Sequence, residues 1–97
     1  MVLSIQDLTP RQFDGADGQR VYDALYPYVL SGTPVDLSFA GVRAATSSFV
    51  NEALVRLLDS VAYDDIKRLV RITDVSRPVG RLIQDRFAFE TTRRVAA

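Results

Sequence analysis

The strongest constraint on the fold is the segment at residues 35–39, Val-Asp-Leu-Ser-Phe, in which apolar and polar residues alternate strictly. Such alternation is typical of a strand with one face in the core and the other in a polar environment. A Gly-Val pair at 41–42 predicts a tight loop after it. From Ser48 to Val61 apolar residues then recur three or four positions apart, which predicts a long amphipathic helix.

The N-terminal part of the chain predicts another strand followed by another helix. Apolar and polar side chains alternate in part over residues 2–5, which predicts a short edge strand. This strand and the loop after it, which contains Pro10, extend through residue 12. Asp17 is a suitable N-cap for a helix beginning near Gly18. We expect this helix to kink or end at Pro27, because proline lacks an amide donor and clashes with the preceding turn.

The C-terminal part repeats the pattern. Residues 69–72 are short and rich in β-branched side chains, which predicts a strand. Pro78 suits the first turn of a last helix, with Ser76 or Arg77 as its cap, and residues 91–97 are expected to form a frayed tail. The resulting order, β-α-β-α-β-α, predicts an α/β fold with a mainly parallel sheet. Eleven side chains are predicted to be buried: Val35, Leu37, Phe39, Val50, Leu54, Leu57, Leu58, Leu69, Ile72, Leu82 and Ile83.

Length and composition narrow the classes of function. The 97 residues suit one domain, and 47% apolar with 25% charged residues is ordinary for a globular protein. Twelve basic residues balance twelve acidic ones without a basic block, which disfavours nucleic-acid binding. No apolar stretch is long enough to span a bilayer and no leader is visible, so a cytoplasmic location without membrane partners is expected.

The residue inventory also limits the chemistry. The chain has no cysteine and no histidine, which removes disulfides, thiolate or imidazole metal ligands and any catalytic triad built on imidazole. The glycine-rich phosphate loops of nucleotide-binding folds are absent, although a Rossmann-like protein would share the element order. We therefore expect no catalytic site, no metal and no cofactor.

The most distinctive stretch of the sequence is its centre. Residues 37–42 read Leu-Ser-Phe-Ala-Gly-Val, and residues 46–54 read Thr-Ser-Ser-Phe-Val-Asn-Glu-Ala-Leu. This strand end and helix start resemble the STAS-like domains of unknown function, small bacterial and archaeal relatives of anti-sigma factor antagonists. The upstream Asp17-Gly18 pair fits the same layout, so the resemblance extends over roughly residues 13–75. It implies a STAS-like single domain with a mainly parallel sheet of about four strands and about three helices.

The resemblance also implies a regulatory protein-interaction module rather than an enzyme. In anti-sigma factor antagonists the serine at this junction is phosphorylated by a partner kinase, and that serine corresponds to Ser48. Thr46 stands where those proteins have an acidic residue, and Phe49 where they have glycine. The implied partner is a protein of the ATPase or histidine-kinase-like regulator class. The residues predicted to contact it are Arg43, Thr46, Ser47, Ser48, Phe49, Asn51 and Glu52.

Several side chains have a simpler interpretation beside the functional one. Ser47 and Ser48 could serve only as helix caps, and Glu52 could serve only to complement the helix dipole. Asp64 and Asp65 could hold a divalent cation or mark a solvated turn. Three aspartates could converge into one cluster or serve only as turn and cap residues: Asp14, Asp17 and Asp23. Three tyrosines could form a contact surface or only border the core: Tyr22, Tyr26 and Tyr28.

Two other functions stay open beside the binding module. The first is a small hydrolase or transferase that uses Asp14, Asp17, Glu52 and a serine, although no imidazole or thiol is present to activate a nucleophile. The second is a structural subunit that forms homo-oligomers through an exposed strand at the edge of the sheet.

Overall fold

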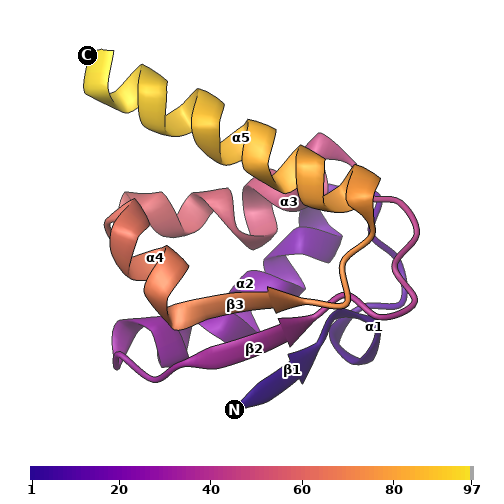
Figure 1. Ribbon diagram of the computed structural model, residues 1–97. Coiled ribbons are helices and arrows are strands. Elements are labelled where there is room, and N and C mark those ends of the chain that lie inside the picture. Colours follow the sequence, from indigo (N-terminus) through magenta and orange to yellow (C-terminus); the bar gives the residue numbers. More distant parts are fainter. Residues whose placement is uncertain (97) are drawn as a thin grey trace.

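The computed structural model describes residues 1–96, with side-chain surroundings for residues 1–94. Each strand is followed along the chain by one or more helices (Figure 1). In chain order the elements are β1 (Val2–Ser4), α1 (Ile5–Leu8), α2 (Gly15–Leu30), β2 (Val35–Ser38), α3 (Ser47–Ala53), the 3-10 helix η1 (Val55–Asp59), α4 (Tyr63–Leu69), β3 (Val70–Thr73) and α5 (Arg77–Ala96). None of these helices is both long and apolar enough to cross a bilayer.

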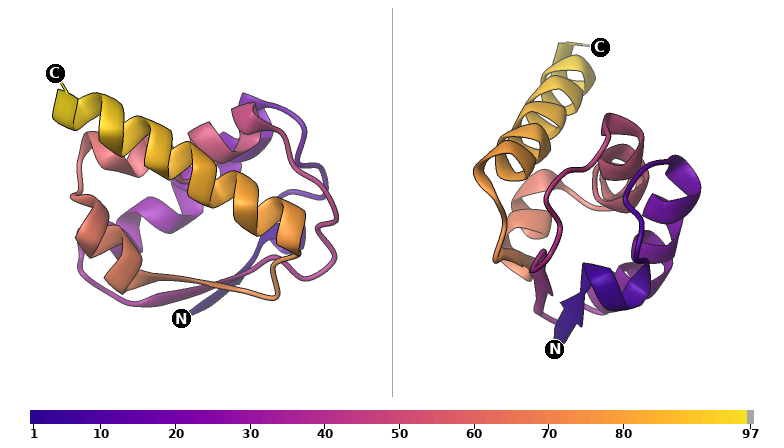
Figure 2. Two further views of the ribbon diagram at one scale, coloured as in Figure 1. Left: turned by 45° about the horizontal axis from the view of Figure 1, so that its top comes forward. Right: turned by 90° about the vertical axis from the view of Figure 1, so that its right-hand side faces the viewer.

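The three strands form one parallel sheet in the order β1-β2-β3. Leu3, Leu37 and Ile72 lie side by side across it. Because each new strand is added in the same direction, crossovers of one hand place their helices on one face. The right-hand view of Figure 2 shows α2, α3 and α5 together on that side. The opposite face presents polar side chains such as Asp36 and Arg71, and a parallel sheet with one open face is uncommon.

The expectation of about four strands and three helices needs correction. Within residues 1–96 the sheet has three strands, and five α-helices accompany the 3-10 helix. The long helix expected from Ser48 to Val61 is broken at Leu54, whose φ of −126° and ψ of −52° end α3. The tighter winding of η1 then places both Val55 and Leu57 in the core, at 5% and 0% exposure. Tertiary packing therefore overrides the regular apolar spacing of this segment.

The boundaries of α2 and α5 also differ from the sequence-based expectation. Asp14 rather than Asp17 is the N-cap of α2, and the helix continues through Pro27 to Leu30. Pro27 and Asp23 are both exposed, so water can bond the carbonyl of Asp23 that Pro27 leaves without an amide donor. For α5, the amide of Val79 donates to the hydroxyl of Ser76 at 3.4 Å, which makes Ser76 the cap. The helix includes residues 91–96 of the expected frayed tail, whose residue 97 lies outside the described residues.

The core lies between the sheet and the helices. Most of the side chains predicted to be buried are buried: Val35, Leu37, Phe39, Val50, Leu54, Leu57, Leu69 and Ile83. Leu58, Ile72 and Leu82 are only half-buried and pack against the rim of this core. Ile72 lies on β3 and Leu82 on α5, so the side of the molecule near β3 is less completely filled than the side near α2.

Candidate functional site

The N-termini of α2 and α3 lie together because the two helices touch at Gly18. A Cβ atom at this position would lie 2.5 Å from the carbonyl oxygen of Phe49 and 2.9 Å from Cβ of Glu52. Real Cβ atoms do not approach other atoms so closely, so any larger residue would push the helices apart. The Asp17-Gly18 pair singled out in the sequence is therefore needed for the approach of α3 to α2.

Thr46 joins the two helix starts by hydrogen bonds. Its hydroxyl accepts from the amide of Phe49 at 3.1 Å and so caps α3. The same hydroxyl donates to the carbonyl oxygen of Phe13 at 2.6 Å, and the Thr46 amide donates to that of Gln12 at 3.3 Å. Thr46 therefore fixes the segment before α2 against the start of α3, and its hydroxyl is used in hydrogen bonds within the protein.

The start of α2 is held by a capping box. Asp14 accepts from the amide of Asp17 at 2.9 Å, and the carboxylate of Asp17 accepts from the amides of Phe13 and Asp14 at 3.1 and 3.4 Å. The hydrogen bond from Phe13 is the main reason that the pKa of Asp17 is below its ordinary value. Both carboxylates are thus used to hold backbone amides, and Asp23 lies exposed further along α2.

Ser47 and Ser48 follow the cap in the first turn of α3, and both are exposed. In the described part of the chain neither hydroxyl forms a hydrogen bond with the rest of the protein, so the interpretation of these serines as caps does not hold. Arg43 is also exposed, in the loop before α3. Phe49, by contrast, is 0% exposed. Its assignment as a contact residue was wrong, because the third position of this helix points into the core.

Asn51 and Glu52 are half-buried and bound within the fold. The amide oxygen of Asn51 accepts from Nε of Arg86 at 2.9 Å, which ties α3 to α5. Glu52 forms an ion pair with Arg56 at 3.2 Å, one turn further on. Of the predicted contact residues, Arg43, Thr46, Ser47 and Ser48 are exposed, and the hydroxyl of Thr46 is already bonded within the fold.

Sequence reasoning missed an exposed aromatic residue at this end of the fold. Phe13 is 60% exposed, and the guanidinium of Arg11 lies 5.5 Å from the centre of its ring. Its backbone carbonyl accepts the hydrogen bond from the Thr46 hydroxyl, so the backbone of Phe13 lies beside the start of α3. The available signal was a large apolar side chain within a loop rich in glycine and aspartate. We call the exposed set Arg11, Phe13, Arg43, Ser47 and Ser48 the helix-start surface.

The remaining acidic candidates do not assemble a site. Asp64 and Asp65 lie in the first turn of α4 and pair with Lys67 and Arg68, at 3.8 and 3.1 Å. Within the residues that the structure describes, no three acidic side chains gather in a way that could hold a metal ion. These aspartates therefore match the simpler interpretation of a solvated helix start.

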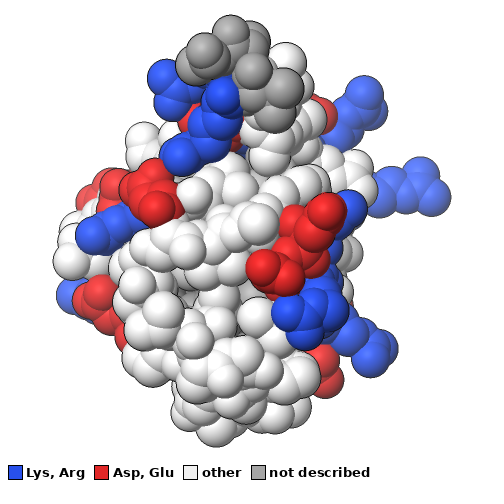
Figure 3. All heavy atoms as spheres, turned by 90° about the vertical axis from the view of Figure 1, so that its left-hand side faces the viewer, with Lys and Arg blue, Asp and Glu red and all other residues white. Residues whose placement is uncertain are grey.

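The tyrosines of α2 border the core. Tyr22 and Tyr26 stack with ring centres 5.2 Å apart, and the guanidinium of Arg56 lies 4.3 Å from the centre of the Tyr22 ring. Burial raises the pKa of Tyr22. The C-terminal half of α2 and the turn after it, residues 24–35, contain no charged residue. Figure 3 shows a face with few charged side chains at its centre and charged ones along its margins.

The comparison with protein families agrees with this architecture. A family model described as a STAS-like domain of unknown function matches residues 17–79. The chain belongs to this family. The match spans α2 to the beginning of α5 and includes Gly18, Thr46 and the serines of the helix-start surface, which confirms the resemblance recognised in the sequence. No curated protein and no solved structure matched the chain significantly. Membership in the STAS-like family accounts for the fold and leaves the function open.

Proposed function

We propose that this STAS-like domain is a non-enzymatic regulatory module that docks on a protein partner through its helix-start surface. The observation that carries this proposal is the exposure of Ser47 and Ser48 while Thr46 does the capping. Both hydroxyls are therefore available to a partner without loss of a bond that holds the fold. An ATPase or histidine-kinase-like regulator is the partner class that the family resemblance favours.

The rigidity of the surface supports a docking role. Gly18 allows contact between the backbones of α2 and α3, and the bonds of Thr46 fix the loop that presents Phe13. Side chains presented on a rigid frame lose little conformational entropy on binding, which favours affinity. An exposed phenylalanine with an arginine beside it also supplies the aromatic and guanidinium groups that are enriched in protein interfaces.

Negative charge at Ser48 would alter this surface without unfolding the domain. A phosphate adds about −1.5 to −2 charges, and the first turn of a helix accepts an anion through its free amides and dipole. Arg43, in the preceding loop, offers a counter-charge. Glu52 lies one turn further on, but its charge is already paired with Arg56 at 3.2 Å. We therefore propose that phosphorylation of Ser48 lowers partner affinity and leaves stability nearly unchanged.

The alternative of a hydrolase or transferase has less support. Asp14 and Asp17 accept backbone hydrogen bonds in the capping box, and Glu52 pairs with Arg56. A carboxylate that is held below its ordinary pKa, as in Asp17, is a weak general base near neutral pH. The chain also offers no imidazole or thiol to activate Ser47 or Ser48.

The test compares Ser48→Asp and Ser48→Ala in binding to the partner captured from the native host. We expect Ser48→Asp to weaken affinity at least about 10-fold, or about 1.4 kcal/mol, as measured by calorimetry. Its thermal midpoint should stay within a few degrees of wild type, equivalent to about 1 kcal/mol or less.

Two controls define the outcome. Ser48→Ala should bind nearly like wild type, and Ser60→Asp, which places the same charge at an exposed position after η1, should leave affinity unchanged. Wild-type affinity in Ser48→Asp, or the same loss in Ser60→Asp, would exclude the proposed role of Ser48.

A further inference from the structure

A groove runs between the edge strand β3 and helix α5. It contains two adjoining apolar hollows, of about 170 Å³ and about 150 Å³. Ile72 of β3 and Ile83 and Gln84 of α5 line both hollows. The first hollow extends toward Val70 and Phe87, and the second toward Val75 and Gly80. Because both hollows border Ile72, they follow one another along the direction of β3.

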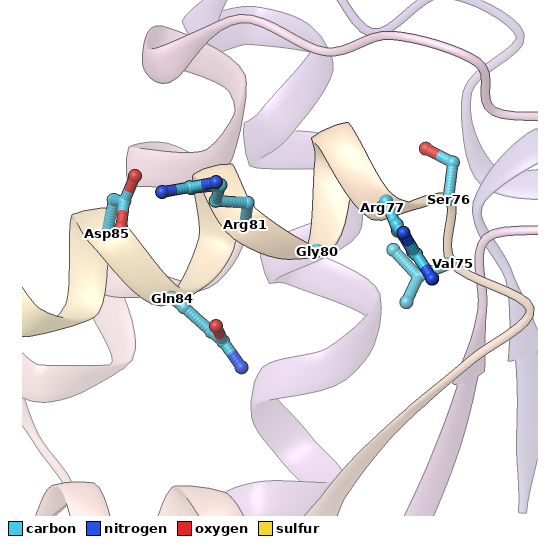
Figure 4. Close-up of a pocket in the computed structure, with 7 residues that line it drawn as sticks. All are labelled: Val75, Ser76, Arg77, Gly80, Arg81, Gln84 and Asp85. Atoms are coloured by element: carbon cyan, nitrogen blue, oxygen red, sulfur yellow. The ribbon is translucent and has the colours of Figure 1, made fainter.

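A third, more polar hollow continues the groove at the start of α5. It shares Val75, Gly80 and Gln84 with the second hollow and adds Arg77 and Arg81. In Figure 4, Gln84 and Arg77 of α5 point to the same side as Val75 in the preceding loop, whereas Arg81, Asp85 and the loop residue Ser76 point to the other. We call the three hollows together the β3–α5 groove.

One side of β3 has no strand neighbour in the described part of the chain. Such an edge carries backbone donors and acceptors that can pair with a further strand. On an added strand, every second side chain would face the helices, about 6.6 to 6.8 Å apart. Two such side chains would enter the two apolar hollows. This is the usual way in which an added strand gains both affinity and specificity.

The charge on Arg71 selects the residue that would lie between those apolar side chains, because Arg71 and that residue would both face the open side of the sheet. Arg71 is exposed on the open face of the sheet, and Arg77 and Arg81 are exposed on α5. Lys67 borders the first hollow and is paired with Asp64 at 3.8 Å. The three arginines, by contrast, form no ion pair within 4.0 Å with any carboxylate of the described residues.

Three acidic residues are nevertheless near, and one of them is exposed Asp74, directly after β3. Asp85 lines the same hollow as Arg81, and Asp36 stands opposite Arg71 in the strand register. None of the three forms an ion pair with these arginines. Among the described residues Arg71 therefore has no ion pair, and opposite charges on neighbouring strands stabilise their pairing.

We infer that the β3–α5 groove binds an extended segment of a protein partner in which apolar and acidic residues alternate, and that this segment adds a strand beside β3. The apolar residues occupy the two hollows, and the acidic residue between them faces Arg71. This binding site uses other residues than the helix-start surface and does not depend on it.

A second copy of the chain fits the groove less well than such a segment. In antiparallel pairing of two β3 strands, Val-Arg-Ile-Thr against itself, both Arg71 side chains would lie on the same face, and like charges there are destabilising. Strand β1, Val-Leu-Ser, carries no acidic residue for Arg71. The charge pattern therefore favours a different, acidic partner.

The test uses a synthetic peptide, acetyl-Thr-Glu-Val-Glu-Leu-Glu-Val-Thr-amide, and the full chain labelled with ¹⁵N. We expect saturable shifts of the amide signals of Val70–Thr73 and of residues around Gly80. A peptide of identical composition but grouped order, Thr-Glu-Val-Leu-Glu-Glu-Val-Thr, should bind at least about 10-fold more weakly, since no two of its apolar side chains stand two positions apart and so they cannot fill both hollows from one face.

Two variants of the groove should lose the alternating peptide for different reasons. Gly80→Leu fills the second hollow, and the helix tolerates it because leucine has a higher helix propensity than glycine. Arg71→Glu reverses the rim charge, and it should instead gain affinity for the same peptide with lysine in place of glutamate. Arg20→Glu, an equal charge change at an exposed position of α2 outside both the groove and the helix-start surface, is the matched control and should bind like wild type.

The proposal is overturned if the alternating peptide shows no binding up to 1 mM, roughly 4 kcal/mol of affinity, or if the grouped peptide binds equally well. It is also overturned if sedimentation shows a dimer of the free chain that Gly80→Leu dissociates, because a second copy would then occupy the groove. Ser48→Asp should leave peptide binding unchanged, so the failure of this proposal and that of the helix-start surface can be told apart.

Discussion

The helices that cover the sheet are packed differently in two regions. Helices α2 and α3 pack closely against each other, whereas a groove remains between β3 and α5. At the first, a Cβ atom on Gly18 would meet backbone atoms at 2.5 and 3.0 Å, so the helices touch without spare room. At the second, a Cβ atom on Gly80 would meet its nearest neighbour, a methyl group of Val75, at an ordinary 3.5 Å, beside hollows of about 170 and 150 Å³.

The comparison distinguishes residues that hold the fold together from residues that are available to a partner. The close α2–α3 contact positions Thr46 and the exposed serines, and little can change there without moving the helix-start surface. In the described part of the chain, the β3–α5 side has half-buried Ile72 and Leu82, a strand edge without a neighbouring strand, and arginines outside any ion pair. A protein interior is normally packed as densely as an organic crystal, so the loosely filled side is where an added segment costs least.

The largest expected effect is on the filled side. Leu57, at 0% exposure in η1, fills the core beneath the helices. Leu57→Ala should lower the free energy of unfolding by about 2–5 kcal/mol, because it leaves a cavity that the packed surroundings cannot close. Leu82→Ala, at a half-buried position of α5, should cost about 1 kcal/mol, since less apolar surface is lost. Urea denaturation measures both, and equal losses would mean that the two sides are filled alike.

Glycine substitutions should have opposite signs on the two sides. Gly18→Ala forces α3 away from α2 and should destabilise the domain by about 1–3 kcal/mol. Gly80→Ala adds a methyl group where contacts are ordinary and raises helix propensity, so it should stabilise by up to about 1 kcal/mol. Thermal unfolding of the two variants is the measurement. A neutral Gly18→Ala would show that the close contact can relax.

The smallest expected effect is on the pH dependence of stability. It compares Asp17, at the start of α2, with Glu90, in the C-terminal part of α5. The pKa of Asp17 is lowered mainly by the hydrogen bond from the Phe13 amide, and that of Glu90 by the hydrogen bond with Arg93. Each carboxylate therefore contributes stability that is fully present above its ordinary pKa, 3.8 for Asp17 and 4.5 for Glu90, and is lost as the pH falls through the folded value.

The two carboxylates can be separated by substitution. Asp17→Asn should flatten the acid side of the stability profile and loosen the start of α2, while Glu90→Gln should flatten it without affecting α2. Denaturation between pH 2 and 6, together with the amide signals of Phe13 and Asp14, tests this assignment. An unchanged acid profile in Asp17→Asn would show that the capping box does not titrate as described.

Sequence reasoning located the strands well and the helix boundaries less well. The alternation at residues 35–39 predicted β2 and its buried face, since period-two burial depends only on local geometry. The prediction of one helix from Ser48 failed at Leu54, where the need to bury both Val55 and Leu57 changes the winding. Phe49 was misassigned for a related reason. A residue three positions after the cap can face inward or outward, depending on which other elements pack against the helix.

The candidate site was predicted in part. The strand end and helix start were recognised from their residues, and Ser48 is exposed as a contact role requires. The caps were displaced by one to three positions, to Thr46 and Asp14, because several serines, threonines and aspartates stand close together and any of them suits a helix start. Phe13 and the β3–α5 groove were not foreseen, since both depend on the surroundings of side chains that are far apart in sequence.

The sequence by itself determined the class of this protein. Its element order, the face of β2 that enters the core, the lack of cysteine and histidine, and the family to which it belongs all follow from residue types and their spacing. The tertiary structure alone decided which serines stay free, how closely Gly18 lets two helices meet, and that α5 leaves a groove beside β3. The reason is physical: periodicity is a property of neighbours along the chain, whereas packing density and open strand edges arise between segments that only folding brings together.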